Sequence, residues 1–185
     1  MDFLSLTAIE AQKRIDSCAG STVHKITVGA AVLRNSHDPQ RDTQILLLKR
    51  SAREKYYPNV FEIPGGKVDT GETLLAALTR EVNEESGLVV SRILKPLATF
   101  SYTTTKTAKS SMTGDEQIIH RYARQFSYVV TIEGDGSDFR VHQAEHSEGS
   151  WFSVSDLANI PMTDEMRNLV VEALSENKDC TDNIS

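Results

Sequence analysis

The spacing of apolar positions along the chain predicts strands and helices in alternation. Strands are predicted at 26–33, 45–48, 89–104, 117–132 and 151–152, where apolar residues run continuously or alternate with polar ones. The turn-rich segment 34–43 joins the first two strands as a hairpin, and the polar segment 105–117 predicts a second loop. Helical spacing predicts helices at 5–18, 72–86 and 163–176. Interleaved helices and strands favour a mixed α/β domain.

The segment 66–88 is the most informative part of the sequence. Gly65 and Gly66 permit close approaches of the backbone that a Cβ would forbid. Asp69 is placed to cap the following helix, with Glu72 three residues later as in a capping box. Gly87 is placed to end that helix. We therefore expect a tight loop that leads directly into a well-delimited helix.

Three carboxylates recur inside this helix at spacings that bring them to one face. Glu84 and Glu85 lie three and four residues after Glu81, so at about 100° per residue all three point the same way. An adjacent face, able to dock on a sheet, consists of Leu75, Leu78 and Val82. Hard divalent cations such as Mg²⁺ or Mn²⁺ prefer oxygen ligands, and one would remove the repulsion between like charges. A solvated acidic face is the alternative interpretation.

This segment resembles the signature box of the Nudix hydrolases. The pattern is a glycine, five residues, a glutamate, seven residues, Arg-Glu, a bulky aliphatic residue, any residue, Glu-Glu, any residue, a glycine and a bulky aliphatic residue. Its fixed positions are all met, by Gly66, Glu72, Arg80, Glu81, Val82, Glu84, Glu85, Gly87 and Leu88. The organisation that follows is an N-terminal helical extension at 1–23, a Nudix domain at 24–176 and a polar tail at 177–185.

The resemblance implies an α/β/α sandwich with a mixed sheet. It also implies hydrolysis of a diphosphate linked to another moiety, with Mg²⁺ or Mn²⁺ as cofactor. The metal ligands that it implies are Glu81, Glu84 and Glu85, together with the Gly65 carbonyl. Glu72 and Arg80 are expected to orient the helix and its ligands.

A loop glutamate is expected as the general base, because some Nudix enzymes carry one about six residues before a tryptophan. Glu145 has that spacing to Trp151, and Glu148 is the nearer alternative. Both can also be read as ordinary solvated acids. The chain's histidines show no metal-ligand spacing and are expected at the surface; they are His24, His37, His120, His142 and His146.

Cations near the box are the candidates for phosphate contact, with solvated surface charge as the alternative. They are Arg50, Arg53, Lys55 and Lys67, with Lys106 and Lys109 in the predicted loop. Aromatic residues can stack on a base or form the rim of a pocket; they are Tyr56, Tyr57, Phe100 and Tyr102. Arg124 interrupts the apolar face of its strand and is expected either to form a salt bridge or to bind substrate.

The substrate is expected to be a nucleoside diphosphate or triphosphate derivative. The second motifs that distinguish several Nudix subfamilies are missing, so the resemblance stops at the superfamily. A terpenyl or other organic diphosphate is the second enzymatic interpretation. A diphosphate-binding regulator with little turnover is the alternative from another class.

The composition limits the partners. The 185 residues carry 20 Lys and Arg against 26 Asp and Glu, a formal net charge of −6. An acidic chain is a poor non-specific binder of nucleic acid or membrane surfaces, so we expect a small-molecule partner. Cys18 and Cys180 form no CxxC pair, and no apolar run approaches membrane-spanning length. We expect a soluble cytoplasmic protein, with a homodimer as an open possibility.

Overall fold

The computed structural model describes residues 3–19, 23–34, 42–109 and 116–175. Its helices are α1 (Ala8–Ala19), α2 (Leu74–Ser86) and α3 (Asp164–Ser175), with a short 3₁₀ helix η1 (Val154–Asn159). Its strands are β1 (Lys25–Arg34), β2 (Gln44–Arg50), β3 (Phe61–Glu62), β4 (Gly65–Lys67), β5 (Val90–Pro96), β6 (Phe100–Lys109), β7 (Glu116–Ile132) and β8 (His146–Phe152).

Strand β1 organises the mixed sheet that these described strands form. It pairs in parallel with β7, so that Lys25 lies beside Ala123 and Thr27 beside Gln125. It also pairs antiparallel with β4 and, at its far end, with β2. Strand β2 continues to β3 and β8, and β7 continues to β5 and β6. The continuous apolar run of β1 follows from this central place, because both faces of the strand are buried.

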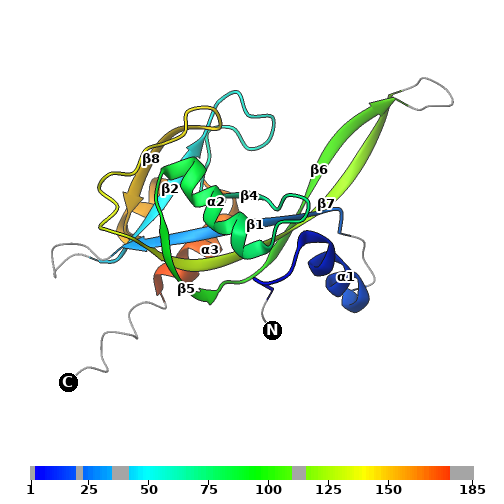
Figure 1. The fold of residues 1–185 in the computed structure, drawn as a ribbon. Coiled ribbons are helices and arrows are strands. Elements are labelled where there is room, and N and C mark those ends of the chain that lie inside the picture. The colour runs from blue at the N-terminus through cyan, green and yellow to red at the C-terminus, as the bar shows by residue number, and fades with distance from the viewer. Residues whose placement is uncertain (1–2, 20–22, 35–41, 110–115, 176–185) are drawn as a thin grey trace.

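Helices cover both faces of the sheet, as the resemblance to the Nudix hydrolases implies. Helix α2 packs its apolar side chains into one core, and α3 packs into the core on the other face (Figure 1). Alternate residues of β1 divide between the two, since Val28 and Val32 face α2 while Ala31 and Leu33 face α3. Of the expected docking face of α2, Leu78 and Val82 are buried, but Leu75 is exposed and Leu74 takes the buried position instead. The expected α/β/α arrangement is confirmed.

Two predictions about strands are wrong. The single strand predicted at 89–104 is two strands, broken after Pro96, where the Leu97 N–H bonds across to the Ser127 carbonyl. The predicted loop at 105–117 is mostly strand, because β6 runs on to Lys109 and β7 already begins at Glu116. These two strands form a ribbon that projects from the body (Figure 1). A ribbon with both faces exposed has no apolar alternation, but its threonines suit extended backbone.

The start of the box helix also differs from the prediction. The capping residue is Thr73 rather than Asp69, with the Thr73 hydroxyl accepting a hydrogen bond from the Ala76 N–H at 3.2 Å. The Glu72 carboxylate still accepts from the Asp69 N–H, at 3.1 Å, but it does so in the turn before the helix. Gly87 ends the helix in a left-handed conformation with φ 70°, as predicted.

The N-terminal extension completes the first turn of α2. The Leu74 and Leu75 N–H groups have no partner within the helix, and they donate to the carbonyls of Leu6 and Leu4, both at 2.9 Å. Phe3 stacks on Phe126 with ring centroids 4.6 Å apart. The extension is therefore attached to α2 and to the sheet.

Some expectations fall outside the described residues, namely those on the polar tail from 177 onwards, on Cys180 and on His37. No helix in the described part of the chain is both long and apolar enough to cross a membrane.

Removing the Phe3 side chain tests the role of the extension. We expect Phe3→Ala to lower the free energy of unfolding by about 1–3 kcal/mol, less than for a fully buried phenylalanine because Phe3 is half-buried. Chemical denaturation measures this change. The matched control is Ile9→Ala, which truncates an exposed apolar residue of α1 and should change the stability by no more than about 0.5 kcal/mol. Equal stabilities of Phe3→Ala and the unmodified protein would contradict the role assigned to this contact.

Candidate active site

Two glycines let the backbone of β4 pass between β1 and α2. A Cβ at Gly65 would lie 2.3 Å from the Val28 carbonyl oxygen, and one at Gly66 would lie 2.4 Å from a Glu81 carboxylate oxygen. The Gly65 N–H donates to Glu85 Oε2 at 2.8 Å. Gly65 therefore lets β4 lie against β1 at a distance that a Cβ would forbid, and its N–H joins β4 to α2.

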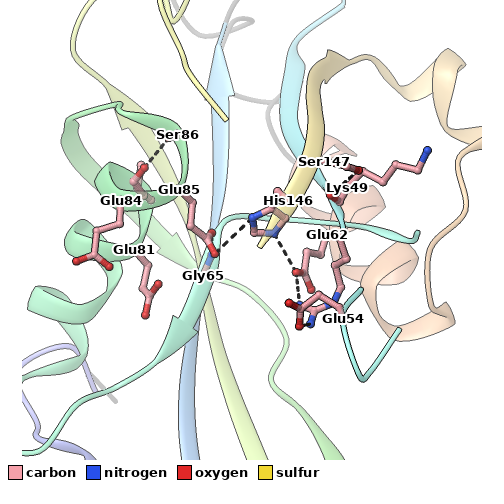
Figure 2. Close-up of polar contacts among 12 residues, drawn as sticks. Lys49, Glu54, Glu62, Gly65, Glu81, Glu84, Glu85, Ser86, His146 and Ser147 are labelled. Carbon is pink, nitrogen blue, oxygen red and sulfur yellow. Dashed lines mark hydrogen bonds and ion pairs between the residues drawn. The ribbon is translucent and has the colours of Figure 1, made fainter. Parts of the chain in front are cut away.

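The three box carboxylates of α2 differ sharply in their surroundings. The side chain of Glu85 is buried and points toward Gly65, that of Glu81 is half-buried, and that of Glu84 is 59% exposed (Figure 2). In the described part of the chain, no three His, Cys, Asp or Glu side chains already form a closed cation site. The three carboxylates expected on one helix face thus differ in exposure, from the buried Glu85 to the exposed Glu84.

Arg80 holds the outer carboxylates in place. Its guanidinium bonds both oxygens of Glu72, at 2.9 and 3.0 Å, and lies 2.9 Å from Glu81 and 3.0 Å from Glu84. It also donates to the Lys67 carbonyl at 3.1 Å, which ties β4 to the helix. The hydrogen bonds from Arg80 lower the pKa of Glu72 below its ordinary value. Arg80 thus joins Glu72, Glu81, Glu84 and β4, and its role in orienting metal ligands stays a prediction.

His146 connects the buried end of the carboxylate group to β8. It is 1% exposed, contrary to the expected surface position, and its Nε2 lies 3.2 Å from Glu62 Oε1 (Figure 2). Its Nδ1 faces Glu85 Oε1 at 3.8 Å and has no hydrogen-bond partner among the described residues. No periodicity marks His146 in the sequence, because its polar partners come from distant segments.

Burial and like charge act together on Glu85. Burial, and to a lesser extent the nearby charges of Glu62, Glu81 and Glu145, raise the pKa of Glu85 to about 9, against the hydrogen bond from the Gly65 N–H. Burial also raises the pKa of Glu81, while Arg80 opposes the change. The site therefore disfavours the charged forms of these two carboxyl groups, because it crowds them where water is scarce.

A cavity of about 360 Å³ opens beside this group, and an adjoining cavity of about 410 Å³ extends it. The first is lined by backbone and side chains of the carboxylate region, including Gly65, Glu81 and Glu145. The second is lined by the aromatic residues Tyr56, Tyr57, Phe61, Phe100 and Tyr102. Both share a boundary formed by Lys25, Arg50, Glu62, Tyr102, Gln125 and Met166. They are two compartments of one cleft, called here the carboxylate compartment and the aromatic compartment.

The expected phosphate-binding cations divide between the cleft and the surface. Arg50 and Lys67 line the cleft, whereas Arg53 and Lys55 are exposed outside both compartments. Arg50 is held by Glu62 at 2.6 Å and Glu54 at 2.9 Å.

Sequence reasoning missed a further cation, Lys25, at the first position of β1. Burial lowers the pKa of Lys25, and the neighbouring charge of Lys67 lowers it further. The parallel pairing with β7 places Lys25 at the boundary of the two compartments, and no local motif indicates it.

The two candidate loop glutamates lie in different surroundings. Glu145 lines the carboxylate compartment, and its backbone carbonyl accepts from the Ser51 N–H at 2.8 Å. Glu148 pairs with Lys49 at 2.9 Å across β2 and β8, outside the compartment. Arg124 has no ion pair among the described residues and lines neither compartment of the cleft, since its guanidinium donates to the hydroxyls of Thr99 and Ser101.

Comparison with known proteins agrees with this arrangement. The NUDIX domain model matches residues 23–173. The NAD-capped RNA hydrolase NudC of Deinococcus radiodurans is 30% identical over 170 residues, which cover 88% of this chain and 50% of that protein. The 8-oxo-dGTP diphosphatase of Escherichia coli is 31% identical over 64 residues, 35% of this chain and 45% of that one. The chain thus spans about half the length of these relatives.

The fold is shared with solved structures as well. The NUDIX domain of Shewanella oneidensis NrtR, solved with ADP ribose, aligns with a TM-score of 0.60 at 16% identity and covers 90% of this chain and 98% of that one. The family match spans the sheet, the box helix and both compartments of the cleft. From the box residues, the layered fold and this match together, the chain belongs to the NUDIX domain family.

Proposed function

We propose that this protein is a divalent-metal-dependent pyrophosphohydrolase of a nucleoside diphosphate or triphosphate derivative. The observation that carries this proposal is the continuity of the carboxylate and aromatic compartments across a boundary that contains Lys25 and Arg50. A diphosphate joined to a base has the same order of parts: an anion that needs cations, and a flat apolar ring. The relatives named for NAD-capped RNA and 8-oxo-dGTP act on compounds of this kind.

The residues present fit a hard divalent cation. Oxygens of Glu81 and of the Gly65 backbone line the carboxylate compartment, and the Glu85 carboxylate lies directly behind Gly65, whose N–H it accepts. Such oxygen donors suit Mg²⁺ or Mn²⁺. Glu84 joins them if it exchanges its bond to Arg80 for the cation. Crowding and burial disfavour the charged forms of Glu81 and Glu85, and a cation would restore them. When bound, the cation neutralises the diphosphate and polarises its phosphoryl oxygens.

Basic residues that line the carboxylate compartment, Lys25, Arg50 and Lys67, are proposed to bind the diphosphate. Lys25 and Lys67 approach each other closely enough to lower the pKa of Lys25, and an anion between them would relieve that repulsion. Arg50 already pairs with Glu62 and Glu54, so its position is fixed before substrate arrives. Arg53, lying outside the cleft, is not included in this role.

The aromatic compartment favours a nucleobase over a terpenyl chain. Its rings provide stacking faces, and its polar residues Thr104 and Gln125 provide hydrogen-bonding groups for the edge of a base. A terpenyl group would leave these polar groups without partners. The nucleotide derivative is therefore the leading substrate class.

Glu145 is proposed to accept the proton of the attacking water. It lines the carboxylate compartment, and its charge reaches both Glu81 and Glu85. A base on this loop approaches the water fully only when the other components are bound.

His146 is proposed to position Glu85. The imidazole is fixed by Glu62 on one side, and its other nitrogen faces the Glu85 carboxylate. Groups behind a metal ligand orient that ligand, and their loss typically weakens metal binding about 10–100-fold.

The proposed function is tested by chromatographic detection of the phosphorylated products, namely nucleoside monophosphates, pyrophosphate or phosphate, from a panel containing ADP-ribose, dinucleotides, nucleoside triphosphates and isopentenyl diphosphate, with and without Mg²⁺. We expect Mg²⁺-dependent turnover of a nucleotide compound, and loss of that turnover by orders of magnitude in Glu85→Gln. Circular dichroism should show that the variant remains folded. Preferred turnover of isopentenyl diphosphate would support the terpenyl alternative, and tight nucleotide binding without turnover would support a regulator.

The loop base is tested by a matched pair of substitutions. We expect Glu145→Gln to lower kcat by about 10²–10⁴ with little change in KM, as loss of a general base does. Glu148→Gln removes the same charge three residues away, from a glutamate paired with Lys49, and should do less. Near-native kcat in both variants would contradict a loop base and would assign the general base to a residue of α2.

Two amide substitutions at His146 distinguish the effect of its contact with Glu85 from that of its contact with Glu62. An asparagine nitrogen lies near the position of Nδ1 and a glutamine nitrogen near that of Nε2, so His146→Asn keeps a donor toward Glu85 and His146→Gln keeps one toward Glu62. We expect His146→Gln to raise the Mn²⁺ dissociation constant about tenfold, and His146→Asn to raise it less. Electron paramagnetic resonance of free Mn²⁺ measures both, with the exposed His142→Asn as control. Equal loss in both variants, in proportion to lost thermal stability, would show a purely structural role.

A further inference from the structure

A further cavity, of about 500 Å³, lies away from the cleft, on the other side of β7. Side chains of a strand alternate between its faces, so Gln125 lines the cleft while Arg124 and Phe126 line this second cavity. The opposite wall comes from Phe3 and Ile15 in the N-terminal extension. Since the family match begins at residue 23, this wall lies outside the matched domain.

The charged side chains that line this cavity, among the described residues, are positive. Arg124 and Lys95 both line it, and no Asp or Glu is among the described residues that do. The Arg124 guanidinium donates to Ser101 Oγ at 3.1 Å and to Thr99 Oγ1 at 2.8 Å. These hydroxyls orient the group without neutralising it, and within the described residues it has no carboxylate partner. Three of its five N–H donors remain for a ligand.

The rest of the lining is apolar and partly open to solvent. Phe3 and Phe126 form a stacked aromatic wall, and Leu94 is 47% exposed at the edge of the cavity. An apolar surface beside an oriented guanidinium matches a molecule with an apolar body and one anionic end. The volume falls within the range of about 300–1,000 Å³ that is usual for small-molecule sites.

We propose that this second cavity binds a small anionic amphiphile, with a carboxylate on Arg124 and its alkyl or aryl body between Phe3, Ile15 and Leu94. The opposite charges of ligand and lining select this occupant over an uncharged one. Two cations line this apolar cavity in a chain of net charge −6, and no acid lines it among the described residues, so an anion is the complementary ligand. The proposal does not depend on the reaction in the cleft.

Octanoate is the probe, and isothermal titration calorimetry on the full chain measures its binding. We expect octanoate to bind, and 1-octanol and acetate, which each lack one half of the recognised chemistry, to bind at least tenfold more weakly. Arg124→Gln should weaken octanoate binding at least tenfold. Arg121→Gln is the matched control, because it removes the same charge from an exposed position of β7 outside the cavity and should leave the affinity unchanged.

A second variant keeps the test independent of Arg124. Leu94→Asp places an acid at the edge of the cavity on an exposed side chain and should also weaken octanoate binding, with the thermal unfolding midpoint as a check on folding. Equal binding of octanoate and 1-octanol, or unchanged binding in both variants, would overturn the proposal. So would a dimer, seen by light scattering, that Leu94→Asp dissociates and to which octanoate does not bind, since the occupant would then be a second copy of the chain.

Discussion

The burial and crowding of carboxylates in a small, partly dry space is the constraint that organises this protein. Burial raises the pKa of Glu85 most, and the nearby charges of Glu62, Glu81 and Glu145 add to that effect. Such a group persists only if the surrounding fold supplies compensation. Arg80 compensates on the solvent side, and Arg50 on the side of β2. Between these two arginines, the Gly65 N–H and the apolar core beneath α2 hold that helix in place.

The apolar cores fix the distances on which this compensation depends. Leu74, Leu78 and Val82 anchor α2 against the sheet, and the glycines of β4 let the helix approach the strand closely. A helix even slightly farther out would separate Glu85 from the Gly65 N–H. The sheet therefore acts as a rigid support, and the carboxylates can stay close to one another without a cation.

The sequence predicts the parts of this site that are local and misses those that are brought together over long distances. The box spacing places Glu81, Glu84 and Glu85 on one helix, and the apolar run at 26–33 predicts the central strand correctly. Lys25 and His146 escape prediction because their surroundings come from β7 and from Glu62, far along the chain. The outer part of the ribbon, where β6 runs from Thr105 to Lys109, escapes it for another reason. Strands exposed on both faces carry no hydrophobic period, and only their pairing with each other identifies them.

The attachment of the N-terminal extension to α2 has an electrostatic consequence. The first turn of a helix carries a partial positive charge and free N–H groups, which commonly bind phosphate. Here the Leu4 and Leu6 carbonyls take two of those N–H groups, and the Thr73 hydroxyl takes a third. The positive pole of α2 is thus closed to anions by the chain itself. A diphosphate that enters the cleft meets this helix along its acidic flank, where the approach is repulsive unless a cation stands between them.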